Sequence, residues 1–64
     1  MENNVIKLMQ VMGKILEESE MNATKFADGN KSAGTRIRKH MQNIKSLAQR
    51  VRVEVQEQKN AVTA

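Results

Sequence analysis

Helical apolar spacing runs through this chain on both sides of a single break, and that pattern constrains the fold most strongly. The break is Asp28-Gly29-Asn30. Glycine suits a left-handed residue just past a helix end, and Asn30 suits the N-cap of a following helix. The chain contains no proline, the residue that interrupts helices most effectively. The pattern therefore predicts a helix over residues 3–27, a turn at 28–30 and a second helix over 31–59, with residues 60–64 frayed.

Apolar residues in both halves recur in alternating steps of four and three, which keeps one face of a helix apolar. Ser19 occupies one rung in the first half, and Ile6, Leu8 and Ile15 widen the stripe. No long stretch alternates with the period of two that a strand requires. The residues predicted to form the core, including the contact between two copies, and called the predicted core below, are Val5, Met9, Met12, Leu16, Phe26, Ile37, Met41, Ile44, Ala48, Val51 and Val55.

A chain of 64 residues has room for one small domain. Two helices of this length form a thin hairpin whose core lies on one side only. We therefore expect an all-α fold, an antiparallel two-helix hairpin, which pairs with a second copy as a homodimer and forms a four-helix bundle.

Positive charge is concentrated in the second half of the chain. Residues 1–28 carry three lysines against five acidic residues, whereas residues 29–64 carry eight lysines or arginines against two acidic residues. Between Gly29 and Val53 there is no acidic residue. A basic block of this kind indicates an anionic partner, and nucleic acid is the usual one.

Four cations of the second helix are spaced by seven residues, so they form one stripe beside the apolar face: Lys31, Arg38, Lys45 and Arg52. The stripe spans roughly 31 Å at the rise of an α-helix, close to the ~34 Å of one DNA turn. The helix N-terminus adds unpaired backbone N–H groups near Ser32 and Thr35. The predicted DNA-binding residues are Lys31, Ser32, Thr35, Arg36, Arg38, Lys39, Lys45, Arg50 and Arg52.

A plainer interpretation is that these cations form a solvated helix face. Antiparallel packing brings Glu20 near Arg38, so acidic residues of the first helix are expected to neutralise part of the charge in weak surface pairs. The lone histidine, His40, is expected at the surface or on a phosphate. The single aromatic residue argues against readers that stack bases.

The amino-acid composition excludes several classes of function. There is no cysteine and only one histidine, so we expect no catalytic site, metal site or cofactor, and no small-molecule substrate. No apolar run reaches the ~20 residues of a membrane span. These features are typical of a cytoplasmic protein that is not an enzyme.

The segment Gly29-Asn30-Lys31-Ser32-Ala33-Gly34-Thr35-Arg36-Ile37-Arg38, followed by Ile44-Lys45-Ser46-Leu47-Ala48 and Arg50-Val51-Arg52, resembles the helical part of the chlamydial linker-histone-like family. The resemblance covers about half of the chain, and the first helix matches only in length and amphipathicity. It implies binding and compaction of bacterial DNA with little sequence preference. Chlamydial members also bear a long Lys- and Ala-rich tail that is not found here, so the helical body is expected to carry the binding.

Two hypotheses follow from these patterns. The first is a small nucleoid-associated, histone-like protein that binds double-stranded DNA non-specifically through phosphate contacts of its second helix. The alternative is a coiled-coil adaptor whose apolar face meets a partner helix, while its charges serve solubility. Self-association separates them, because an adaptor awaiting its partner is expected to be monomeric or poorly folded alone.

Overall fold

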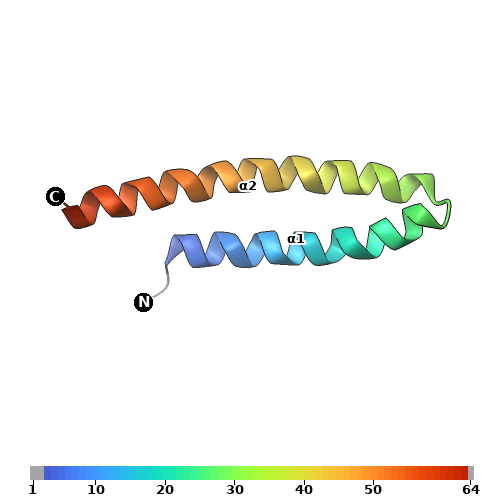
Figure 1. Cartoon of the computed structure of the whole chain (residues 1–64), viewed down its shortest axis with the longest axis horizontal. Coiled ribbons are helices and arrows are strands. Elements are labelled where there is room, and N and C mark those ends of the chain that lie inside the picture. The colour runs from blue at the N-terminus through green and yellow to red at the C-terminus, as the bar shows by residue number, and fades with distance from the viewer. Residues whose placement is uncertain (1–2, 64) are drawn as a thin grey trace.

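The computed structural model of the chain is an antiparallel pair of helices joined by a tight turn (Figure 1). Helix α1 covers Asn4–Ala27 and helix α2 covers Lys31–Thr63. The structure describes residues 3–63, and the side chains of residues 3–61. The molecule measures 53 × 20 × 11 Å, so it is a flat rod only one helix thick. The predicted all-α helical hairpin is confirmed.

The turn has the geometry that its sequence predicts. Gly29 has a φ of 105°, which favours glycine because it lacks a Cβ. The Gly29 N–H donates to the Phe26 carbonyl at 3.0 Å, and the Asn30 N–H donates to the Lys25 carbonyl at 3.0 Å. This is a Schellman motif, which satisfies carbonyls at the end of α1. The Asn30 side chain then accepts from the Ala33 N–H at 3.2 Å, so Asn30 caps α2 as expected.

Helix α2 is longer than the sequence pattern predicted. It continues to Thr63 instead of ending near Lys59, while Ala64 lies outside the described residues. The reason is that no glycine or proline occurs after Gly34, and the backbone hydrogen bonds continue without a break. Figure 1 shows this end of α2 reaching beyond the start of α1.

The contact between the two helices, called the seam below, follows a regular helical spacing on each side. The seam positions, which are buried or half-buried, are Val5, Leu8, Met12, Ile15, Ser19 and Asn22 of α1, and Ala33, Ile37, His40, Ile44, Leu47, Val51, Glu54 and Gln58 of α2. Burial is shallow even here. Among the described apolar residues, only Leu8 (8% exposed) and Ala33 (0%) are fully buried.

The seam uses a different set of α1 residues from the predicted core. Leu8 and Ile15 face α2, whereas Met9 and Leu16 remain exposed. Both sets have helical spacing and share Val5 and Met12, so the sequence pattern does not separate them. Other predicted core residues also stay largely outside the seam: Phe26, Met41 and Val55 are 54%, 41% and 37% exposed.

Polar pairs across the seam show its register. The amides of Asn3 and Gln58 donate to each other at 2.8 and 3.1 Å near the open end of the hairpin. Further along, Asn4 Nδ2 donates to Glu54 Oε1 at 3.2 Å. Because the helices are antiparallel, residues at the same height along the hairpin have numbers that add to about 58 to 61, as these pairs do.

Candidate nucleic-acid interface

The basic stripe of Lys31, Arg38, Lys45 and Arg52 lies exposed along α2. Arg38, Lys45 and Arg52 each follow a seam residue directly, which turns their side chains about 100° away from the seam. Lys45 and Arg52 line a shallow groove on α2, together with Gln42, Ser46, Ala48 and Gln49. The structure thus presents these cations in one row on one side of the helix.

The remaining predicted DNA-binding residues are spread around α2. Arg36 turns toward α1, where its Nε donates to Asn22 Oδ1 at 2.7 Å, using one of its five N–H donors. Arg50 lines a groove between the two helices, on the side of the hairpin away from the stripe. Lys39, Ser32 and Thr35 are exposed near the start of the helix. The nine predicted residues therefore do not form a single surface.

Within residues 3–61, no acidic side chain forms an ion pair with a cation of the basic stripe. The expected pair between Glu20 and Arg38 is not formed, because both side chains lie on the outer parts of their helices. Glu18 turns to His40 instead, with Oε2 3.6 Å from Nε2. The stripe keeps its charge available for an external anion.

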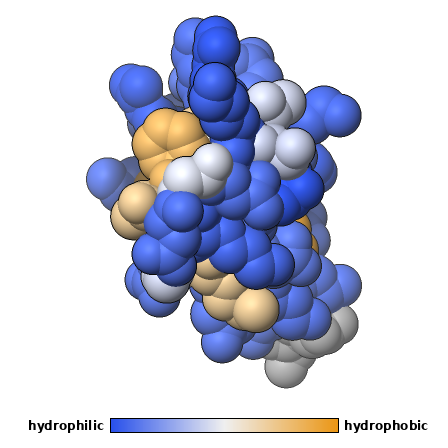
Figure 2. Space-filling model, turned by 90° about the vertical axis from the view of Figure 1, so that its right-hand side faces the viewer, coloured by the Kyte–Doolittle hydropathy of each residue, from blue (hydrophilic) through white to orange (hydrophobic). Residues whose placement is uncertain are grey.

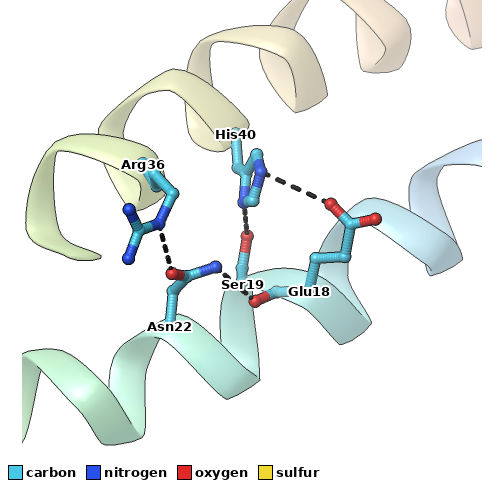
Figure 3. Close-up of polar contacts among 5 residues, drawn as sticks. All are labelled: Glu18, Ser19, Asn22, Arg36 and His40. Carbon is cyan, nitrogen blue, oxygen red and sulfur yellow. Dashed lines mark hydrogen bonds and ion pairs between the residues drawn. The ribbon is translucent and has the colours of Figure 1, made fainter. Parts of the chain in front are cut away.

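His40 faces the seam, where its side chain is only 18% exposed, whereas the sequence predicted a position at the surface or on a phosphate. A hydrogen bond of 2.9 Å joins its Nδ1 to Ser19 Oγ, and Glu18 approaches its other ring nitrogen (Figure 3). Ser19 is only 7% exposed, so this pair is a buried polar layer of the seam. The missed signal is that His40 falls in the same spacing as Ile37, Ile44 and Val51.

Serine, histidine and a carboxylate also occur together in hydrolases, but the arrangement here is a structural one. The Ser19 hydroxyl is enclosed between two helices, so a substrate has no access to it. Within residues 3–63, no three His, Asp or Glu residues gather as ligands for a metal ion. Neither described helix is sufficiently apolar over a sufficient length to cross a membrane.

An apolar surface borders the basic stripe. We call Met9, Leu16, Phe26, Met41 and Val55 the apolar face; each is between 37% and 54% exposed. Met41 and Val55 lie three residues after Arg38 and Arg52, so on the helix they are direct neighbours of the stripe. Figure 2 views the molecule from the turn end and shows separate apolar patches on a mostly hydrophilic surface.

Comparison with known families agrees with this arrangement. The family model of the histone H1-like protein Hc1 matches residues 6–61, which include nearly all of α1, the turn, and the whole basic stripe. The chain belongs to this family. It is a family of structural, DNA-binding proteins and not of enzymes. A search of curated proteins and a search of solved structures each found no match to the chain.

Proposed function

We propose that this protein is a nucleoid-associated protein that binds duplex DNA non-specifically through the basic stripe of α2. The observation that carries the proposal is the row of exposed cations without intramolecular acidic partners, in a chain of the histone H1-like family. Their spacing along α2 matches about one turn of duplex. The bacterial nucleoid, in the cytoplasm, is the proposed location.

The mechanism is release of counterions from the DNA backbone. Each lysine or arginine that reaches a phosphate displaces condensed cations, and the gain depends on salt and not on base sequence. Within the side chains that the structure describes, none pairs with a stripe residue to orient it toward base edges, which favours low sequence specificity. With three or four phosphate contacts per chain, a dimer has roughly six to eight contacts and a salt slope near −5 to −7.

We further propose that the hairpin functions as a homodimer, forming a four-helix bundle. The hairpin exposes 5339 Å² of surface, whereas a compact monomer of 7.2 kDa exposes about 4100 Å². The difference exceeds the ~800 Å² that each partner buries in a standard interface. With only Leu8 and Ala33 fully buried among the described apolar residues, the hairpin lacks a core of its own.

A titration of a random-sequence duplex of about 30 base pairs, repeated at several salt concentrations, tests the DNA-binding proposal. We expect tight binding at low salt, the steep slope given above, and equal affinity for a second duplex of unrelated sequence. Absence of binding at about 50 mM salt would overturn the proposal.

The exposed apolar face also favours the second candidate function, an adaptor for a partner helix. Sedimentation of the isolated protein separates the two functions. A cooperatively folded dimer at micromolar concentration supports the nucleoid protein, and a monomer with low helicity supports the adaptor.

A further inference from the structure

The two edges that border the apolar face carry different charges. On α2, the residues three positions before Met41, Ala48 and Val55 are the stripe cations Arg38, Lys45 and Arg52. On α1, the equivalent residues, three positions before Met9, Leu16 and Ala23, are Ile6, Gly13 and Glu20. One edge is therefore uniformly basic, and the other contains no cation and one acid.

These two edges are matched in height along the hairpin. The contact between Asn22 and Arg36 joins residues whose numbers add to 58, and that between Asn4 and Glu54 does the same. By the same relation, Glu20 lies level with Arg38, and Gly13 lies level with Lys45. Ile6 lies level with Arg52.

Two copies can pack their apolar faces against each other with two-fold symmetry in two ways. A two-fold axis along the bundle places α2 of one copy over α1 of the other, with both turns at the same end. A two-fold axis across the bundle places α2 over α2 and α1 over α1, with the turns at opposite ends. The second way sets one row of cations against an identical row, which is unfavourable for exposed like charges.

We propose that the protein forms the same-end dimer and that this dimer bridges two DNA duplexes. In this arrangement Arg38 meets Glu20 of the second copy at the same height, and Lys45 meets Gly13 of that copy. Charge complementarity thus selects a second copy of this chain as the occupant of the apolar face. The inference rests on the proposed DNA binding and the proposed homodimer, and adds how the two copies are oriented in the dimer.

Bridging follows from where the stripes lie. In the same-end dimer the two α2 helices are diagonal in the bundle, so their stripes face opposite flanks. One duplex on each flank then binds without competing for the same surface. The opposite-end dimer places both stripes on one flank, where they serve a single duplex.

The first test measures the distance between the two turns. The chain has no cysteine, so Asp28→Cys carries one nitroxide spin label per copy at an exposed turn position. The same-end dimer predicts a pulsed-EPR distance of roughly 20 Å, since neighbouring helices lie 8–10 Å apart. The opposite-end dimer predicts more than about 40 Å along helices of this length. The longer distance would overturn the proposed geometry. So would a protein that is still monomeric at about 100 µM.

The second test measures bridging directly. A duplex on beads is incubated with the protein and a second, fluorescent duplex, whose retention reports bridging. Leu16→Glu, on the apolar face, is expected to reduce retention more than about tenfold, because it removes the dimer. Met21→Glu is the matched control: Met21 is 65% exposed on the outer side of α1 and should leave retention unchanged.

The outcomes also separate this inference from the DNA-binding proposal. Binding of single duplexes without retention of the second duplex would overturn bridging and leave DNA binding intact. Failure to bind any duplex would overturn both, while the label distance still decides the geometry of the dimer. Circular dichroism of both Glu variants shows whether a lost signal reflects lost association or lost helix.

Discussion

Ser19 and His40 hydrogen-bond across the seam at 2.9 Å, and this pair is a buried polar layer in the middle of the hairpin. A buried polar group costs free energy when it lacks a partner, so each of the two residues depends on the other. A polar layer also favours the register that pairs it over sliding by one heptad.

We expect Ser19→Ala to lower the free energy of unfolding by about 1 kcal/mol, because it leaves His40 Nδ1 without its partner. The double variant Ser19→Ala with His40→Leu removes both polar groups and should be close to the parent protein in stability or above it. Urea unfolding followed by circular dichroism measures both. A double variant less stable than the single variant would contradict this account.

Phe26 and Gly34 are coupled at the turn end. A Cβ added to Gly34 would lie 2.7 Å from Cε1 of the Phe26 ring, too close for the ring to keep its place. We expect Gly34→Ala to stabilise the helix by about 1 kcal/mol when Phe26 is alanine, and this gain to be absent when Phe26 is present. A double-mutant cycle from thermal unfolding measures the coupling. Additive effects would show that the ring moves aside freely.

Replacement of two other glycines by alanine is predicted to change the stability of the hairpin in opposite directions. Gly29→Ala should destabilise the hairpin by about 1 kcal/mol, because φ of 105° is unfavourable for any residue with a Cβ. Gly13 lies within α1 with nothing within 4 Å of its added Cβ, so Gly13→Ala should stabilise by about 0.5–1 kcal/mol. Melting temperatures of the two variants, measured at equal protein concentration, test the pair together.

Charge reversal of the groove residues tests the basic stripe. We expect Lys45→Glu with Arg52→Glu to weaken duplex binding at least tenfold and to make the salt slope shallower by roughly 3 to 4, because a dimer loses four phosphate contacts. The control is Lys14→Glu with Lys25→Glu, which has the same net charge but changes α1. Fluorescence anisotropy at several salt concentrations measures both. Equal losses in the two variants would show that net charge, and not the stripe, controls binding.

The hairpin itself was predictable from local sequence signals. Asp28-Gly29-Asn30 contains both the residue that accepts a positive φ and the residue that caps the next helix, and these preferences act within a few residues. The row of Lys31, Arg38, Lys45 and Arg52 was predictable for the same reason, because helical periodicity alone places residues seven apart on one side.

The sequence alone thus determined two helices, the turn between them and a continuous cationic row. Only the tertiary structure decided that Leu8 and Ile15 form the seam while Met9 and Leu16 stay outside, and that His40 turns inward to Ser19. Two sets of apolar residues with the same helical period lie side by side on α1, so periodicity alone does not show which set packs against α2. The choice depends on which set fits the opposing helix, including its polar layer, and that fit exists only after the two helices have packed.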